Sequence, residues 1–306
     1  MTKQDSEQDF ASAAMMRLAI AGSARQGISV PLRSPSGAHV PRSQKREVLD
    51  AVLTAHGPLA ILSIADAARQ TPPEPVAQAL LRARDTGDLL DRWHRLERFS
   101  HGRHRIEVRR LGEDSFQLTH HARDAGPPPS PAESLLVLGL LTTLAEMIGS
   151  ADVSLVSSTG EIWRENGAWR APTRTPPTGS AVLSALPMPR AACRNASIPV
   201  KDPIEGLRQH LVADPVRRWT LADLASAAGA SPRTLQRRLA EKSVSFTRLV
   251  SETRLQVAAS HLCDANGPGL AEIGFLAGFS DQAHFARSFS HAVGTTPSAY
   301  RADFSR

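Results

Sequence analysis

Two stretches of the sequence carry polar side chains of the types that recognise the edges of DNA bases. One stretch follows Ser231-Pro232 and the other follows Ser280-Asp281. Arginine can pair through two hydrogen bonds with guanine, and glutamine can do the same with adenine, when a helix presents them to the major groove. We therefore take the following residues as candidate DNA contacts: Arg233, Thr234, Gln236, Arg237, Gln282, Ala283, His284 and Arg287.

The first stretch lies in a pattern typical of two helices joined by a tight turn. Thr220 and Asp223 have the spacing of a capping box, which begins a helix, and Gly229 can take the left-handed conformation that ends one. Ser231 can cap a second helix with Pro232 at its first position, where the missing N–H removes no hydrogen bond. Apolar residues at helical spacing give each helix a buried stripe: Leu221, Leu224, Ala225, Leu235 and Leu239. This is the helix-turn-helix plan.

A second copy of the plan follows later in the chain. Gly278 ends a helix, Ser280 or Asp281 can cap the next one, and Phe285 and Phe289 then face its interior. Between the two copies, Ser245 predicts the start of a long helix that runs from 246 to about 262. A rigid helical spacer would hold the two recognition helices one DNA turn apart, about 34 Å.

The region 203–301 resembles the DNA-binding domain of the AraC family of transcription regulators. The segments 278–289, GFSDQAHFARSF, and 294–301, GTTPSAYR, are close to the signature of that family. The sequence departs from the family pattern at three positions: Gly274, where alanine is usual, and Ser290 and His291, where basic residues are common. The resemblance implies that this region binds promoter DNA, and that the protein contacts RNA polymerase if it is an activator. The alternative for the outward arginines is a solvated helix face.

The first two hundred residues mix helical and strand-like patterns. Helices are predicted at 44–55, 59–70, 75–99 and 133–148, with possible breaks at Gly57-Pro58 and Thr86-Gly87. Alternating residues predict strands around 106–108, 116–118, 153–157, 161–164 and 168–170. Proline and small residues dominate 172–189, which predicts an irregular segment or linker.

We therefore predict an α+β N-terminal domain followed by an all-α domain with two helix-turn-helix units joined by a long helix. The expected boundaries are a flexible lead-in over 1–40, an effector-sensing or dimerisation domain over 41–190, a linker over 191–202 and the DNA-binding domain over 203–306. The segment 91–105 is similar to a stretch in the sensory domains of ornithine- and arabinose-type AraC regulators. The resemblance implies a sensing domain, although a domain that only dimerises or binds a protein partner is the alternative.

Arginines and histidines cluster near that segment. Arg103 and Arg105 are candidate ligands for an anionic effector, because guanidinium groups pair with carboxylate or phosphate through two hydrogen bonds. Five nearby histidines could suggest a metal site: His94, His101, His104, His120 and His121. The positive charge of the arginines between them opposes cation binding, so we predict no metal site.

Composition narrows the remaining function classes. The 306 residues carry a net charge of +6, which suits a polyanionic partner, but residues 203–306 hold only half of it. The first two hundred residues contain no glycine-rich phosphate loop and no Gly-x-Ser-x-Gly elbow, so an enzyme with a DNA-binding tail is disfavoured and no cofactor is expected. The two cysteines, Cys193 and Cys263, are far apart in sequence, so we expect neither a disulfide framework nor a cysteine metal site. No secretory signal is evident, and no apolar run approaches the roughly 20 residues of a membrane span. We expect a cytoplasmic protein that could form a homodimer.

Overall fold

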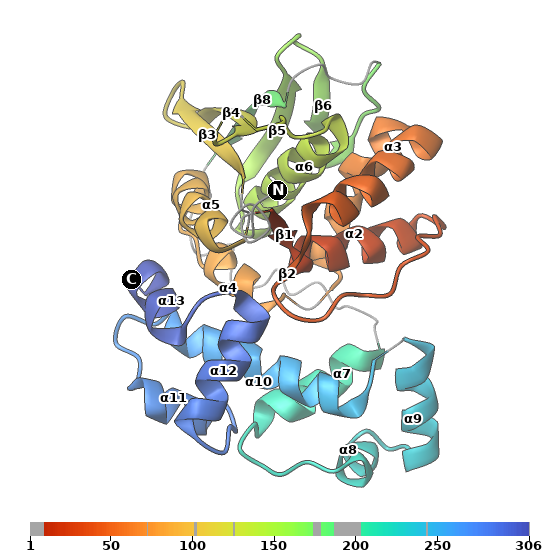
Figure 1. The fold of residues 1–306 in the computed structure, drawn as a ribbon, viewed down its shortest axis with the longest axis vertical. Coiled ribbons are helices and arrows are strands. Elements are labelled where there is room, and N and C mark those ends of the chain that lie inside the picture. The colour runs from red at the N-terminus through yellow and green to blue at the C-terminus, as the bar shows by residue number, and fades with distance from the viewer. Residues whose placement is uncertain are drawn as a thin grey trace. The chain divides into compact units, whose positions relative to one another are not determined.

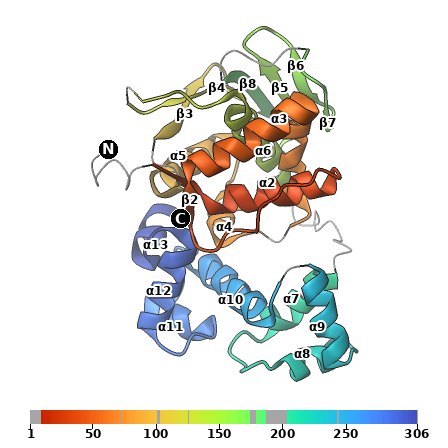
Figure 2. The same ribbon diagram turned by 45° about the vertical axis from the view of Figure 1, so that its right-hand side comes forward.

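The computed structural model describes residues 9–71, 73–100, 103–124, 126–173, 179–186, 203–242 and 244–305. The chain divides into two compact units. The mixed unit contains residues 1–71 and 80–197, and the helical unit contains residues 72–79 and 198–306. The ribbon in Figures 1 and 2 shows strands only in the first of these and helices throughout the second. The predicted α+β domain followed by an all-α domain is therefore confirmed.

A six-stranded antiparallel sheet forms one layer of the mixed unit, in the order β3-β4-β8-β5-β6-β7. Its strands are β3 (His104–Arg110), β4 (Ser115–Ala122), β5 (Ala151–Ser157), β6 (Ile162–Glu165), β7 (Ala168–Trp169) and β8 (Ser180–Leu186). Alternate residues of β4, β5 and β8 are buried, as the period of two in an extended strand requires. A separate two-stranded sheet pairs β1 (Phe10–Ser12) with β2 (His39–Pro41).

The helix α6 (Pro131–Met147) occupies the centre of the mixed unit. It contacts α3 (Arg42–Ile64) and the strands β4, β5 and β8, and almost every residue from Ala132 to Ala145 is buried. Figure 2 shows α3 and α6 running on the same side of the sheet. The remaining helices of this unit are α2 (Ala13–Arg25), the 3-10 helix η1 (Ala65–Arg69) and α5 (Thr86–Ser100). A helix that is apolar all round has to be covered on all sides, which explains its place between α3 and the sheet.

The segment from Arg42 to Arg69 is long and apolar enough to cross a membrane by length and composition, although polar residues interrupt it. Gly57, with φ 77°, and Pro58 divide this segment, as the sequence predicted. Beyond the break, Ile61, Leu62 and Ile64 are fully buried within the unit. These apolar side chains are therefore part of the protein core.

Two sequence expectations for the mixed unit were wrong. Residues 10–25 were expected in a flexible lead-in, but they form β1 and α2, whose Ala13, Met16 and Ala19 are buried. The segment 172–189 was expected to be irregular, but its residues 180–186 form β8, which pairs with β4 on one side and with β5 on the other. Small residues with weak hydrophobicity form both elements, so the sequence signal was faint, and long-range packing provides the stability.

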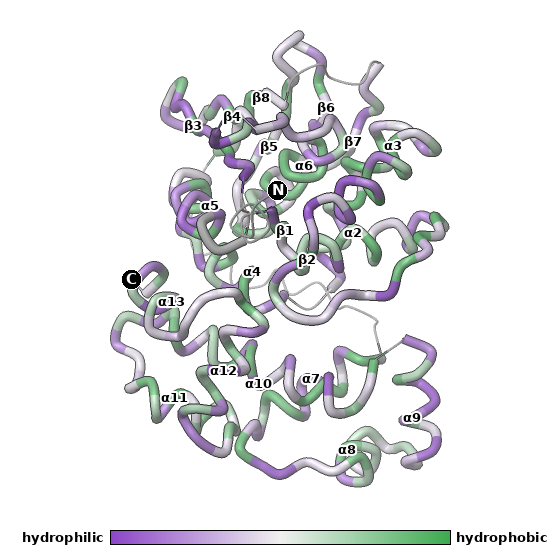
Figure 3. The backbone as a smooth tube through the Cα atoms, viewed as in Figure 1, coloured by the Kyte–Doolittle hydropathy of each residue, from purple (hydrophilic) through white to green (hydrophobic). Residues whose placement is uncertain are grey.

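The helical unit is built from seven helices in the region 203–305. They are α7 (Pro203–Ala213), α8 (Leu221–Ala227), α9 (Pro232–Glu241), α10 (Phe246–Leu262), α11 (Leu270–Leu276), α12 (Gln282–Val293) and α13 (Pro297–Phe304). The first part of α4 (Pro75–Leu81) also belongs to this unit. The tube coloured by hydropathy in Figure 3 shows that polar and apolar residues alternate along most of these helices, and that α9 is strongly hydrophilic.

Candidate DNA-binding surface

The first helix-turn-helix unit, formed by α8 and α9, has the caps that its sequence predicts. The Thr220 hydroxyl accepts a hydrogen bond from the backbone N–H of Asp223 at 3.1 Å, and the Asp223 carboxylate accepts one from the backbone N–H of Thr220 at 2.9 Å. Gly229 has a φ of +62°, and Ser231 caps α9 by accepting from the N–H of Thr234 at 3.2 Å. The predicted capping box, left-handed turn and second cap are confirmed.

The helix α9 separates buried from exposed residues sharply. Leu235 and Leu239 are 0% and 2% exposed and pack in a cluster with Leu224, Leu249 and other apolar residues. Three of the candidate contacts, Arg233, Gln236 and Arg237, lie on the opposite face and are exposed. The fourth, Thr234, is half-buried. Because the apolar stripe fixes the rotation of the helix, these three side chains share an outward face.

Two of these candidate residues already have partners within the chain. The Thr234 hydroxyl lies 2.9 Å from the Ser231 hydroxyl, so it is occupied in part by the cap of α9. The Arg237 guanidinium donates to the Glu241 carboxylate at 2.9 Å, and both side chains are largely exposed. An exposed pair of this kind contributes little stability, so Arg237 can exchange Glu241 for a nucleic-acid oxygen at small cost.

The second helix-turn-helix unit, formed by α11 and α12, presents its predicted residues in the same way. Asp281 is the N-cap of α12, since its carboxylate accepts from the backbone N–H of His284 at 2.7 Å. That hydrogen bond is the main reason why the pKa of Asp281 lies below its usual value. Phe285 and Phe289 of this helix are buried. All of its candidate contacts are exposed, namely Gln282, Ala283, His284 and Arg287.

The imidazole of His284 is held close to the first turn of α12. One ring nitrogen lies 3.2 Å from the Ser280 hydroxyl, and the ring meets Phe279 edge-on at 5.5 Å. These contacts fix the ring beside the exposed residues of the same turn. A DNA contact from His284 would therefore come from an oriented ring.

The long helix α10 joins the two units, and a charged network holds it against α7. Ser245 caps it as predicted. Glu252 accepts from Arg208 at 2.8 Å and from Arg248 at 2.7 Å. Burial raises the pKa of the Glu252 carboxyl, but the hydrogen bonds and positive charges of the two arginines outweigh it and leave the pKa below its usual value. The network therefore keeps Glu252 ionised.

A polar exposed face on the second helix of each of two helix-turn-helix units, joined by one long helix, defines a DNA-binding domain. A helix-turn-helix domain family matches residues 224–303. The helical unit is an AraC-type helix-turn-helix domain, as its sequence resemblance indicated.

Two curated transcriptional activators are each similar to about a third of this chain. The urease operon transcriptional activator of Escherichia coli is 33% identical over 93 residues, which are 30% of this chain and 31% of that protein. The transcriptional activator AggR of Escherichia coli is 31% identical over 94 residues, which are 31% of this chain and 35% of that protein. The chain thus spans about a third of the length of these curated relatives. A transcriptional regulator structure from Chromobacterium violaceum is 23% identical over 34% of this chain and 93% of its own, with a TM-score of 0.32.

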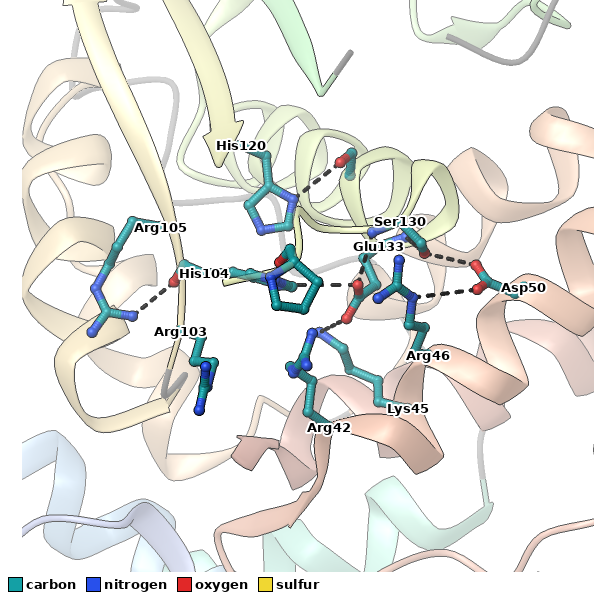
Figure 4. Close-up of polar contacts among 12 residues, drawn as sticks. Arg42, Lys45, Arg46, Asp50, Arg103, His104, Arg105, His120, Ser130 and Glu133 are labelled. Atoms are coloured by element: carbon teal, nitrogen blue, oxygen red, sulfur yellow. Dashed lines mark hydrogen bonds and ion pairs between the residues drawn. The ribbon is translucent and has the colours of Figure 1, made fainter. Parts of the chain in front are cut away.

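In the mixed unit, the two candidate effector ligands lie at the start of β3, Arg103 immediately before the strand and Arg105 within it, and both have partners in the protein. The Nε atom of Arg103 lies 3.9 Å from the carboxylate of Asp9. Arg105 donates to the carbonyl oxygen of His104 at 2.7 Å, and burial lowers the pKa of its guanidinium. Figure 4 shows Arg105 on the strand and Arg103 just before it, on either side of His104. Their role as effector ligands stays a prediction.

A buried polar cluster that the sequence analysis did not anticipate lies beside them (Figure 4). Lys45 of α3 is 1% exposed and its Nζ lies 3.6 Å from the Glu133 carboxylate of α6, which is fully buried. Glu133 also closes a capping box, because it accepts from the backbone N–H of Ser130 at 2.9 Å. The partners lie far apart in sequence, so nothing in the local pattern pointed to this pair.

Two of the histidines that were considered as metal ligands, His104 and His120, complete this cluster. His104 lies 3.9 Å from the Glu133 carboxylate, and His120 donates to or accepts from the Ser134 hydroxyl at 3.2 Å. Burial lowers the pKa of His104, and it lowers the pKa of His120 well below the usual value. Among the described residues no group of three metal-ligating side chains converges, while His101 and Cys193 lie outside them. The thiol of Cys263 is buried in the helical unit and donates to the Tyr300 hydroxyl at 3.8 Å.

A polar cleft of about 620 Å³ opens elsewhere on the mixed unit. Its lining includes Asp66, Arg69, Glu146 and Arg164, but neither Arg103 nor Arg105. Arg164 is 4% exposed and donates twice to Glu146, at 2.9 and 2.7 Å, while its guanidinium lies over the ring of Trp169 at 4.5 Å. The cleft is therefore a second place in which a small polar molecule could lie.

Proposed function

We propose that this protein is a cytoplasmic, sequence-specific DNA-binding regulator of transcription. The observation that carries the proposal is the pair of recognition helices, α9 and α12, whose exposed faces hold arginine and glutamine while their opposite faces are buried. Such side chains can read base edges in the major groove. The curated relatives are transcriptional activators by name, which supports an activator that contacts RNA polymerase at its promoter.

The full-length chain should bind duplex DNA, and its affinity should fall steeply as salt rises, because phosphate contacts release counterions. On a selected operator, Arg237→Ala should weaken binding by about 1–3 kcal/mol and relax the preference at one base pair. Arg233→Ala and Gln236→Ala should affect the same half-site. Gln282→Ala and Arg287→Ala should affect the other half-site. Fluorescence anisotropy on operators with single base changes measures each effect.

Arg170→Ala provides a matched control, because Arg170 is exposed on the mixed unit and pairs with Glu165. It should leave DNA affinity unchanged. If all five recognition-helix variants lose the same affinity on every sequence, these residues contact phosphate only. Absence of binding to any duplex at low salt would disprove the proposal.

We also propose that a small anionic effector binds the mixed unit and controls occupancy of the DNA. The support is the arginine pair Arg103 and Arg105 near the buried polar cluster, together with the size of the unit, which has its own core. An effector acts only through its difference in affinity for two states of the protein. It must therefore contact a part of the unit that changes with DNA binding.

A metabolite screen by thermal shift of the full chain should identify a stabilising anion, since a ligand that binds the native state raises its stability by mass action. Arg103→Ala and Arg105→Ala should abolish that shift and leave DNA binding intact. If instead Asp152→Asn, in the polar cleft, abolishes the shift while the arginine variants respond normally, the effector lies in the cleft. If no metabolite shifts the stability or the DNA affinity, the mixed unit is a module that dimerises or binds a protein partner.

We propose no catalytic activity for the chain. Its relatives are regulators by name. The side chains of the mixed unit whose pKa is shifted do not line the polar cleft: Lys45, His104 and His120 belong to the buried cluster, and Asp88, Glu97, Arg105 and Glu161 lie elsewhere. A buried ion pair with no access to a substrate has a structural role by default.

A further inference from the structure

A short segment from the amino-terminal half of the sequence belongs to the helical unit. The mixed unit comprises residues up to Thr71 and resumes at Leu80, so the segment between them is packed with the helices of 198–306. The boundary between the two units, between Ala79 and Leu80, falls within the helix α4 (Pro75–Leu81). Its first residues therefore belong to the helical unit, and its last two belong to the mixed unit.

Two hydrogen bonds from the helical unit hold this segment. The side-chain amide of Gln256, on α10, donates to the carbonyl oxygen of Pro73 at 2.7 Å. The hydroxyl of Tyr300, on α13, donates to the carbonyl oxygen of Pro75 at 2.8 Å. Tyr300 is fully buried and Pro75 is buried as well. Because a hydrogen bond made by a buried group adds to the stability of the fold, the bond from Tyr300 to Pro75 stabilises the position of the segment.

The same tyrosine is connected by packed rings to the second recognition helix. Its ring lies 5.3 Å from that of Phe289, and Phe289 lies 5.7 Å from Phe285, with both pairs edge-on. Both phenylalanines belong to the buried face of α12, and Arg287 lies on the opposite, exposed face. A displacement of residues 73–79 that moves Tyr300 would therefore alter the packing of Phe289 and Phe285 of α12.

We propose that the surface formed by Gln256 and Tyr300 is the docking site for residues 73–79 of this same chain, and that α4 transmits the state of the mixed unit to the second helix-turn-helix unit. The coupling rests on the proposed function, for which it supplies the route from effector to DNA, whereas the docking does not depend on it. Residues 75–79 of α4 belong to the helical unit, and Leu80 and Leu81 of the same helix belong to the mixed unit, so a change at Leu80 can reach the two hydrogen bonds along one short helix.

Hydrogen exchange of the full-length chain, without DNA or effector, tests the docking. Gln256→Ala and Tyr300→Phe each remove one hydrogen bond to the segment, and Tyr300→Phe keeps the ring in place. Exchange of the amides in 76–81 should rise roughly fivefold for each variant and roughly thirtyfold for the double variant. Ser251→Ala, on an exposed position of α10, is the matched control and should change nothing. Equal exchange in the double variant and in this control would overturn the docking.

DNA affinity of the same variants tests the coupling. The double variant should bind duplex DNA several-fold more weakly than wild type, and Ser251→Ala should bind as wild type does. If exchange rises but affinity stays at the control level, the segment is docked and α4 transmits nothing. If the wild-type chain binds no DNA at all, the proposed function fails, while the exchange result still decides the docking.

Discussion

Replacing Gly278 by alanine should destabilise the helical unit by at least about 3 kcal/mol, among the larger effects of a single substitution. Gly278 has a φ of +84°, a left-handed conformation that side chains disfavour by about 1–2 kcal/mol. An added Cβ would also lie only 1.9 Å from the carbonyl oxygen of Pro215, in the loop between α7 and α8. The backbone has to move to relieve this overlap, which would separate the turn of the second helix-turn-helix unit from that loop.

Gly229 is the matched control for this substitution. It occupies the equivalent turn of the first helix-turn-helix unit with a φ of +62°, but an added Cβ there would meet nothing within 4 Å. Gly229→Ala should therefore cost only the conformational part, about 1–2 kcal/mol. Urea titration with pulsed hydrogen exchange in α8 and α12 measures both variants within the full chain. Equal costs for the two variants would show that the contact with Pro215 is not tight.

The helical unit was predictable because its signals are local. Thr220, Ser231 and Ser245 were expected as helix caps and each accepts the predicted backbone hydrogen bond. For the second recognition helix the sequence left Ser280 and Asp281 open, and Asp281 is the cap. A cap requires residues only three positions apart, so a single sequence contains all of the information.

The mixed unit was less predictable because its decisive contacts are remote in sequence. The strand β8 is stabilised by β4 and β5 on both sides, so its weakly apolar residues suffice in the centre of a sheet. The segment 73–79 looked like part of a helix of the amino-terminal domain, but its partners are Gln256 and Tyr300. Local patterns indicate helices and strands, whereas only the folded chain shows which surfaces meet.

The buried pair of Lys45 and Glu133 follows the same rule, and breaking it should have the largest effect on the mixed unit. Lys45→Met or Glu133→Gln alone should cost about 3–5 kcal/mol of unfolding free energy, because each leaves the other ionisable group buried without its partner. Glutamine keeps an oxygen that can accept from the Ser130 N–H, so the capping box of α6 can survive and the loss reports the charge. The double variant Lys45→Met/Glu133→Gln should recover most of the stability, since no charge is left to bury. Arg46→Met is the control one residue away, because Arg46 and Asp50 form a half-exposed pair 3.7 Å apart that contributes about 1 kcal/mol or less, and Asp50 keeps the hydrogen bond that it accepts from the Ser130 hydroxyl.

The pH dependence of unfolding provides a second readout for the same pair. Burial lowers the pKa of Lys45 below its ordinary value of 10.5, and the charge of Glu133 opposes this only in part. Between the lowered pKa and 10.5, the unfolded chain therefore binds a proton that the folded chain has released. Stability should rise with pH across that window, since the unfolded state binds more protons there. Lys45→Met should remove this rise, and Arg46→Met should retain it. Urea unfolding of the full chain between pH 7 and pH 10, with hydrogen exchange in α3 and α6 as the local probe, measures the slope. Two results together would contradict this account: Lys45→Met leaves the pH slope of stability unchanged, and both single variants lose less than about 1 kcal/mol of unfolding free energy. They would mean that water reaches the pair and that its charges are not buried.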